Sequence, residues 1–241
     1  DFLASFNDPK LKLIPENGCP NPVALKLTDK LVVIAYDSEW FLFPYNKDNP
    51  DCECNSKDQV IMRLKELFDQ HKDKMIILAS HHPFQSYGIH GGYYTLKDHL
   101  FPFTALNKNL YIPLPIVGSL YPLLRTTFVN PEDMGHPLYK EMIEKVNHVF
   151  GDLPNVVYAA GHEHGLQLIK GQQLQIVSGA GAKHTANKLG KNSLFHSFEN
   201  GYVLADQLVN NDMRYEYYIY TDTGVNKVFS YTQPYQPIEK V

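Results

Sequence analysis

The sequence predicts an α/β fold in which a mixed β-sheet carries helices on its face, and three observations lead to this class. Aliphatic runs such as Leu31–Tyr36 have the length and composition of strands buried on both faces. Segments with helical spacing precede two such runs, as in the αβ half of a crossover unit. From Gly165 onward, short alternating segments typical of antiparallel strands take over.

The N-terminal part is expected to form a strand pair, a helix and a buried strand. The segments 22–27 and 31–36 are the strand pair, with a turn at 28–30. Ser56 and Gln59 predict a capping box at the start of the helix. Its apolar stripe contains Val60, Ile61, Leu64, Leu67 and Phe68, and the buried strand follows at 75–79.

A second helix and strand are predicted further along the chain. Helical spacing joins Tyr139, Met142, Ile143, Val146, Val149 and Phe150. Gly151 stands where a helix stop is expected, and 156–160 is the next buried strand. The antiparallel part is predicted to contain strands at 166–169, 174–177, 202–204, 215–220 and 228–231.

Length and charge limit the classes of function. A chain of 241 residues is long enough for one large domain, and we expect residues 1–241 to form a single domain. The formal net charge is −4 and no block of Lys and Arg is present, so we expect no nucleic-acid partner. The start of the sequence does not resemble a signal peptide, and no apolar run has the length of a bilayer span.

The three cysteines leave two pairings open. Cys52 and Cys54 are too close to each other for a relaxed disulfide, but either could reach Cys19 across a loop. One cysteine is then left over. Three cysteines also fall short of the four ligands of a structural zinc site.

The segment 96–137 is predicted to be an insertion, because about forty residues is much longer than an ordinary connection. It is rich in prolines and large apolar residues, and prolines at this frequency exclude a continuous helix. One interpretation is an insertion with its own small packed cluster. The alternatives are a lid over the site, or a surface for a partner or a membrane.

Histidines follow two of the predicted buried strands. His81 comes directly after one strand, and His162 and His164 come directly after another. Loops at the carboxyl ends of strands are where α/β sheets bind ligands. In an extended loop His162 and His164 would point to the same side. Since neutral imidazole binds zinc, iron and manganese-class ions, we expect a metal site formed by these three residues.

These motifs resemble those of the calcineurin-like metallophosphoesterases. The segment 78–83, Leu-Ala-Ser-His-His-Pro, is similar to the fourth motif of that family, and 161–164 matches its Gly-His-x-His motif. The similarity is nearest to the purple acid phosphatases of the tartrate-resistant type, which have a His-Gly pair where His90 and Gly91 stand, and a glycine-rich turn like 178–181. The resemblance covers about 21–183 and implies a four-layer α/β/β/α sandwich.

The resemblance also implies roles for individual residues. His81 and His162 would bind one metal ion and His164 the other, so that the complete protein would hold two ions of the Fe, Zn or Mn class. His90 would contact the phosphate or protonate the leaving group of a phosphate-ester substrate. His82 is assigned to the catalytic residues, or to a supporting position behind the ligand that it follows.

The acidic motifs of the family have no counterpart in the sequence. Asp-x-His, Gly-Asp-x-x-Asp and Gly-Asn-His-Asp/Glu are all missing. We therefore expect the C-terminal part of a metallophosphoesterase domain without its N-terminal βαβ portion, and at most one weakly held ion in this chain. A sheet that lacks strands has open edges, which predicts self-association or pairing with another chain.

Two hypotheses of function follow. In the first, the complete protein is a metal-dependent, phosphomonoesterase-like hydrolase, of which this chain carries half of the dinuclear site and is inactive alone. In the second, the chain is a non-catalytic interaction or scaffold module that keeps the metallophosphoesterase fold. The apolar insertion favours a membrane-associated or fused parent protein in an extracytoplasmic or membrane-associated setting, although the sequence does not name the compartment.

Overall fold

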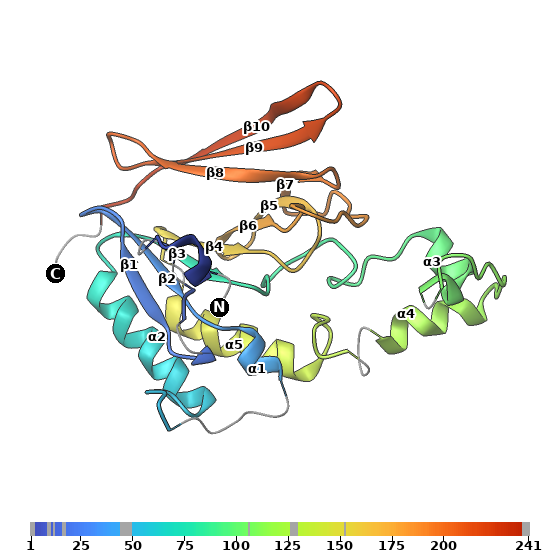
Figure 1. Cartoon of the computed structure of the whole chain (residues 1–241), viewed down its shortest axis with the longest axis horizontal. Coiled ribbons are helices and arrows are strands. Elements are labelled where there is room, and N and C mark those ends of the chain that lie inside the picture. Colours follow the sequence, from blue (N-terminus) through green and yellow to red (C-terminus); the bar gives the residue numbers. More distant parts are fainter. Residues whose placement is uncertain are drawn as a thin grey trace.

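The computed structural model describes residues 3–8, 11, 13–15, 18–43, 50–105, 107–125, 130–151 and 153–237. Two β-sheets stack on each other, and helices cover the free face of the larger sheet (Figure 1). The mixed α/β class predicted from the sequence is confirmed. The described residues form three of the four expected layers, since Figure 1 shows no helix on the outer face of the smaller sheet.

The larger sheet has seven strands in the order β1-β2-β3-β4-β6-β5-β7. Its central strands β2, β3, β4 and β6 are parallel, and both edges are antiparallel. The strands are β1 (Val23–Lys26), β2 (Leu31–Ala35), β3 (Met75–Ser80), β4 (Val156–Ala160), β5 (Leu166–Lys170), β6 (Leu174–Ser178) and β7 (Ser193–Ser197). The parallel centre places the carboxyl ends of β2, β3 and β4 at one edge, where the histidines follow.

The smaller sheet is an antiparallel meander in the order β10-β9-β8. Its strands are β8 (Gly201–Gln207), β9 (Met213–Thr221) and β10 (Gly224–Gln233). Tyr215 and Tyr217 on β9 are fully buried between the sheets, and the Tyr217 hydroxyl donates to the Gln167 carbonyl of β5 at 3.1 Å. A hydrophobic core therefore lies between the two sheets, where alternate residues of β9 face the larger sheet.

The helical layer contains α1 (Glu39–Leu42), α2 (Lys57–His71) and α5 (Pro137–Phe150). Phe68 and Phe150 pack edge to face at 5.2 Å between ring centroids and join α2 to α5. At the start of α2 the Ser56 side chain accepts from the Gln59 N–H at 3.2 Å. The Gln59 side chain accepts from the Asn55 N–H at 2.7 Å. In the predicted capping box it would accept from the Ser56 N–H, so the observed bond goes to the residue before the N-cap.

The sequence missed strand β7. Only Leu194 and Phe195 are apolar among its five residues, which is too few for a period-two pattern. The strand forms because β5 offers an open edge, where Leu168 pairs with Phe195. Each of the strands predicted from the sequence overlaps an observed one.

The residues 96–125 form a lobe that projects from the side of the two-sheet body (Figure 1). It contains α3 (Leu96–Leu100), the 3-10 turns η3 (Pro102–Ala105) and η4 (Val117–Ser119), and α4 (Leu120–Leu124). No long helix runs through its described residues, as the prolines predict. We call this segment the apolar lobe.

A disulfide joins Cys19 to Cys52, with 5.4 Å between their Cα atoms, while Cys54 is buried as a free thiol. The pairing that the sequence left open is therefore Cys19 with Cys52. The bond ties the N-terminal segment, which includes the 3-10 turn η1 (Leu3–Phe6), to the loop before α2. Among the described helices, none combines the length and the apolar character that crossing a bilayer requires.

Candidate metal centre

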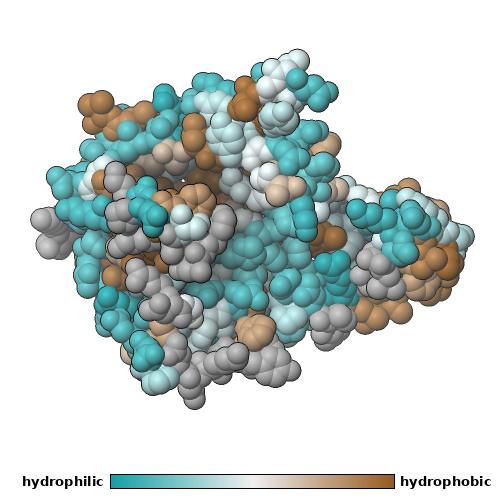
Figure 2. Space-filling model, in the orientation of Figure 1, coloured by the Kyte–Doolittle hydropathy of each residue, from teal (hydrophilic) through white to brown (hydrophobic). Residues whose placement is uncertain are grey.

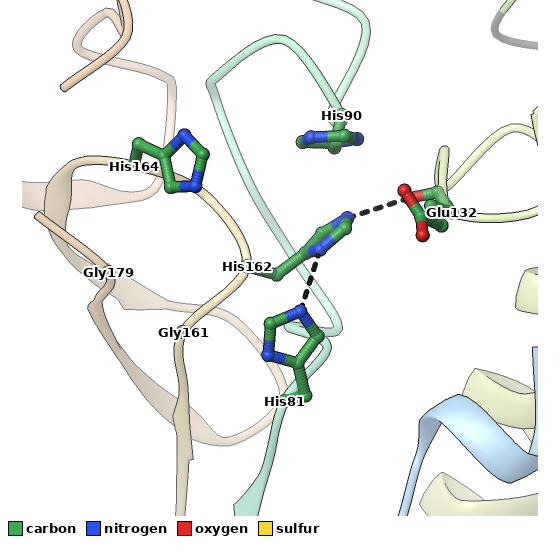
Figure 3. A pocket seen from close by; sticks show the side chains of 7 residues that line it. All are labelled: His81, His90, Glu132, Gly161, His162, His164 and Gly179. Carbon is green, nitrogen blue, oxygen red and sulfur yellow. Dashed lines mark hydrogen bonds between the residues drawn. The ribbon is translucent and has the colours of Figure 1, made fainter. Parts of the chain in front are cut away.

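Two histidine loops meet because β3 and β4 are neighbouring parallel strands. Ser80 at the end of β3 pairs with Ala160 at the end of β4, and the Gly161 N–H donates to the His81 carbonyl at 3.1 Å. His81 and His162 therefore leave the sheet side by side. The His162 Nδ1 atom lies 3.1 Å from the His81 Nε2 atom (Figure 3).

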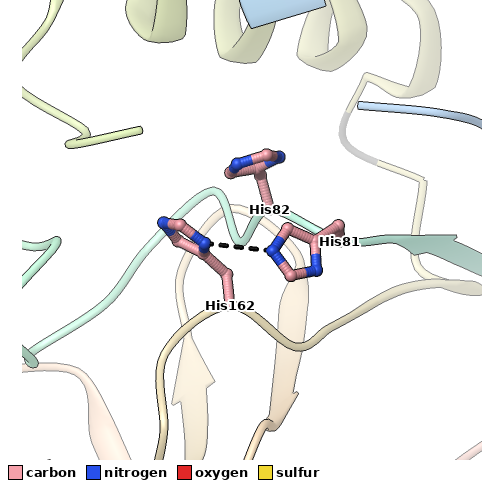
Figure 4. A group of neighbouring side chains, drawn as sticks. All are labelled: His81, His82 and His162. Atoms are coloured by element: carbon pink, nitrogen blue, oxygen red, sulfur yellow. Dashed lines mark hydrogen bonds between the residues drawn. The ribbon is translucent and has the colours of Figure 1, made fainter. Parts of the chain in front are cut away.

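A group of three imidazoles forms at this point: His81, His82 and His162 (Figure 4). One ring nitrogen of each lies within 4.8 Å of the others. Two imidazole nitrogens that share a tetrahedral ion stand about 3.3 Å apart, given metal–nitrogen bonds of about 2.0–2.1 Å. The His162 Nδ1 and His81 Nε2 atoms, which are hydrogen-bonded to each other at 3.1 Å, are close to that separation, so these two nitrogens can share one ion.

His82 is fully buried and has one unused ring nitrogen. Its Nδ1 atom lies 2.9 Å from the hydroxyl of Ser38, which follows β2. Its Nε2 atom is buried and makes no hydrogen bond, and the Glu39 Oε2 atom is 3.5 Å away. A buried polar atom without a partner is unfavourable, and a metal ion would supply that partner. The sequence placed His82 among the catalytic or supporting residues, and here one of its ring nitrogens lies within 4.8 Å of a ring nitrogen of His81 and of His162.

All three imidazoles are held in the neutral form. Burial, followed by the neighbouring His90, lowers the pKa of His162 to about 3. Burial, followed by the His162 and His81 rings, lowers the pKa of His82 to about 2. Partial burial also lowers the pKa of the more exposed His81. Neutral imidazole is the form that coordinates metal ions, so the site is electrostatically prepared for a cation.

The group borders a cavity of about 450 Å3, whose lining includes His81, His90, Glu132, His162 and His164 (Figure 3). His164 faces this cavity but is not part of the three-imidazole group. The loop is not extended as the sequence argument assumed, because His162 has a φ of 59°. The two histidines line one cavity through a turn instead, since Gly165 donates to the Glu163 carbonyl at 2.8 Å.

His90 stands next to His162 and is held by a buried carboxylate. The two ring centroids are 3.9 Å apart, and the His90 Nδ1 atom is 2.7 Å from the Asp133 Oδ1 atom. Asp133 is fully buried and also accepts from the Arg125 Nε atom at 3.3 Å. The sequence missed Asp133, because it lies in the insertion 96–137 and nothing near it suggested a partner for His90.

Glu163 locks the His90 loop onto the His162 loop. Its Oε1 atom accepts from the Ser86 hydroxyl at 2.9 Å, the His90 N–H at 2.8 Å and the Gly91 N–H at 3.2 Å. Gly88 lets the carboxylate approach, since a Cβ atom there would lie 2.3 Å from its Oε2 atom. The sequence treated Glu163 as the variable position of its motif, but it fixes the place of His90.

Three carboxylates surround the imidazoles. Asp37 and Glu39 follow β2, and Glu132 belongs to the insertion. Burial raises the pKa of Glu39, and the charges of Glu132 and Asp37 raise it further. Among the described residues, none of them joins the three-imidazole group. A bound cation would relieve the repulsion between these three carboxylates. The family motifs did not point to any of the three, so the sequence missed them.

No protein-family model and no curated protein sequence matches the chain. Solved structures resemble it at low identity. PhoD has a TM-score of 0.52 and 15% identity over 88% of this chain and 42% of PhoD. The purple acid phosphatase PPD1 from yellow lupin (Lupinus luteus) has a TM-score of 0.45 and 12% identity over 88% of this chain and 32% of that protein. GAP50, the anchor in the inner membrane complex of Plasmodium, has a TM-score of 0.46 and 16% identity over 92% of this chain and 56% of that protein.

The likeness to PhoD concerns the fold. The two stacked sheets with helices on one side are a metallophosphoesterase-like architecture. At this level of identity nothing about substrate or metal follows from the likeness. The chain spans about half of GAP50 and less than half of the other two proteins.

Proposed function

We propose that the chain provides the imidazole half of the metal centre of a metal-dependent phosphoric ester hydrolase. The observation that carries the proposal is the convergence of three neutral imidazoles on one point, beside a fourth imidazole held by the buried Asp133. A single ion of the Fe, Zn or Mn class suits this set, because all of its donors are imidazole nitrogens.

His81, His82 and His162 would hold this ion, and His164 would face a second ion in a complete dinuclear site. When bound, such ions stabilise the charge on phosphoryl oxygens and activate a water molecule. Asp37, Glu39 and Glu132 add negative charge around the imidazoles and so favour a bound cation. Carboxylate ligands from outside the three-imidazole group would be needed to balance two ions.

His90 would act as the general acid. Asp133 engages its Nδ1 atom and orients the ring, which leaves Nε2 to give a proton to the departing alkoxide oxygen. Glu163 is the positioning residue, since it holds the backbone of His90. The proposed substrate is a phosphate monoester small enough for a cavity of about 450 Å3.

The second candidate function is a non-catalytic scaffold. Two observations favour it: the three-imidazole group contains no carboxylate among the described residues, and the projecting lobe exposes many apolar side chains. A scaffold would keep the fold and the histidines but would neither need a stable metal centre nor hydrolyse esters.

Metal analysis of the purified chain tests the proposal. We expect one weakly held zinc-class ion per chain, measured by mass spectrometry after incubation with the metal and desalting. His81→Ala and His162→Ala should lose this ion, because each removes a ligand of the group. His148→Ala is the matched control, since His148 is exposed in the last turn of α5.

Hydrolysis of a chromogenic phosphate ester completes the test. We expect no turnover by this chain alone, and turnover that depends on His90 in a protein that also supplies the carboxylate ligands. Two ions per chain with turnover would contradict the half-site. No metal uptake by the wild-type chain would reject the metal centre and leave the scaffold function.

A further inference from the structure

The apolar lobe carries a dense group of exposed apolar side chains. Ile116 is 91% exposed, Leu96 74% and Val117 65%. Figure 2 shows hydrophobic surface on the projecting lobe at the right, in addition to smaller patches on the two-sheet body. The other exposed apolar side chains of the lobe are Leu110, Tyr111, Ile112, Leu120 and Leu124. Scattered single apolar residues are ordinary on protein surfaces, whereas a contiguous set marks an interaction site.

The charge of the lobe differs from that of the rest of the chain. Residues 96–125 contain three basic side chains, Lys97, Lys108 and Arg125, and one acidic side chain, Asp98. Arg125 is paired with the buried Asp133, so Lys97 and Lys108 against Asp98 leave the lobe a small positive excess on a chain whose formal charge is −4. Asp98 is engaged as a helix cap, accepting from the Thr95 N–H and hydroxyl, both at 2.7 Å. Lys97 and Lys108 are exposed.

Among the described residues, most backbone N–H groups of the exposed stretch 110–120 donate within the lobe, and those of Ile112 and Ile116 do not. The Leu114 N–H donates to the Leu100 carbonyl at 2.8 Å, and the Gly118 N–H donates to the Leu114 carbonyl at 2.7 Å. Further bonds within the lobe start from the N–H groups of Leu110, Tyr111, Val117 and Ser119. Pro113 and Pro115 have no N–H to satisfy. A segment that enters an apolar phase must satisfy its donors in this way, because lipid offers no partners.

Ile116 lies at the tip of a strained turn. Its φ of 71° and ψ of −61° are those of a three-residue γ-turn, closed by the Val117 N–H and the Pro115 carbonyl at 2.9 Å. A β-branched residue rarely adopts a positive φ, and such strain tends to occur at functional positions. The strained backbone here holds an isoleucine out into solvent, where it contributes nothing to the core.

We propose that the apolar lobe docks on an anionic lipid bilayer. Ile116, Val117 and Leu120 insert into the interfacial zone, while Lys97 and Lys108 contact acidic headgroups. Apolar insertion combined with basic side chains is how peripheral proteins lie on membranes without crossing them.

The observations favour a bilayer over a protein partner. A protein partner could supply hydrogen-bond partners to the lobe, so the internal bonding of the backbone would not be required. The lobe also projects from the body instead of forming a groove, which suits a flat deformable surface (Figure 1). The positive excess on an otherwise acidic chain matches a negative surface and would oppose contact between the lobes of two copies.

Vesicle co-sedimentation of the full chain tests the proposal. Binding is expected to vesicles of phosphatidylcholine with about one third phosphatidylserine, to be weaker on pure phosphatidylcholine, and to fall as salt is raised. Ile116→Asp should lower the partition constant by about tenfold or more. The substitution removes an apolar side chain that would insert into the bilayer, and it adds a negative charge. The double variant Lys97→Glu, Lys108→Glu should weaken binding to the anionic vesicles by a similar factor.

Val209→Asp is the matched control. Val209 is fully exposed in the turn between β8 and β9, outside the lobe, so the same substitution there should leave vesicle binding unchanged. Circular dichroism of each variant checks the fold.

Three outcomes would overturn the proposal. They are no binding of the wild-type chain to either vesicle, equal loss of binding in Ile116→Asp and Val209→Asp, and self-association in solution that Ile116→Asp abolishes. The last would identify the lobe as an interface between copies. The test is independent of metal binding, because none of these residues belongs to the candidate metal centre.

Discussion

At the scale of single residues, the candidate site depends on buried imidazoles kept neutral and on two buried carboxylates, Asp133 and Glu163. His82 and His162 are deprived of water, so they lose affinity for protons and remain available to a cation. Glu163 is not part of the three-imidazole group, but it holds the backbone of His90 in place. A residue at a variable position of the motif, Glu163, therefore helps to arrange the candidate site.

The metal-free chain is expected to lose stability in acid. In the folded state the pKa values of His82 and His162 are about 2 and 3, against about 6.5 for an unfolded chain. Below pH 6.5 the unfolded state binds more protons, so stability is complete above that pH and falls as pH drops towards 3. The free energy of unfolding should fall by about 1 kcal/mol or more per pH unit. The readout is the melting temperature, which should fall between pH 7.5 and 5 in the presence of a chelator.

A matched variant identifies the groups responsible. His82→Gln removes one of the two titrating rings, so the decline with acid should become shallower even where the variant is less stable overall. A melting temperature that does not change between pH 7.5 and 5 would contradict the neutral buried imidazoles.

Glu163→Ala is expected to destabilise the protein by about 2–4 kcal/mol, because it leaves three donors without their shared acceptor. Urea denaturation gives the free energy of unfolding. Glu199→Ala is the control, since Glu199 is exposed. If both substitutions change the free energy of unfolding by the same small amount, the Glu163 hydrogen bonds do not stabilise the loop.

At the scale of elements, strand ends and helix starts determine where the site lies. The parallel pair β3 and β4 brings together histidines that are 81 residues apart in the chain. Helix α2 behind them begins at a well-formed N-cap. These elements could be predicted from the sequence, because buried strands and amphipathic helices have local periodicities. Strand β7 could not, since the open edge of β5 and not its own pattern makes it a strand.

Ser56→Ala should cost about 1 kcal/mol, since it removes the acceptor for the Gln59 N–H at the start of α2. Ser56→Thr keeps the acceptor and should lie within a few tenths of a kcal/mol of the wild type. Chemical denaturation of the three proteins measures the difference. A Thr variant as unstable as the Ala variant would mean that the cap hydrogen bond is not the cause.

At the scale of the whole molecule, one hydrophobic core lies between the larger sheet and the helices and another between the two sheets. The disulfide adds a covalent link between two loops. The edges of the larger sheet are β1 and β7, and β1 is only four residues long. Self-association through these edges stays a prediction, as do the phosphate-ester substrate and the second metal ion. Short edge strands offer few free backbone groups for pairing, so any such association should be weak.

Reduction of the disulfide should lower stability by about 2–4 kcal/mol, as expected for closing a loop of this size. The two cysteines are 33 residues apart in the sequence. A reductant should therefore lower the melting temperature of the wild-type chain. It should not change that of the double variant Cys19→Ser, Cys52→Ser, which serves as the control. Peptide mapping that finds Cys19 joined to Cys54 would contradict the pairing.

The fold class, most of the strands and helices, and the histidines of the candidate site could be predicted from the amino-acid order alone. These properties depend on local periodicity and on residue types at strand ends. The partners of those histidines were decided by the tertiary structure. Asp133 meets His90, Ser38 meets His82 and Glu163 meets the His90 loop only after distant segments pack, and no local pattern encodes such contacts. Burial likewise sets the low pKa values of His82 and His162, because it depends on what the completed fold places around each ring.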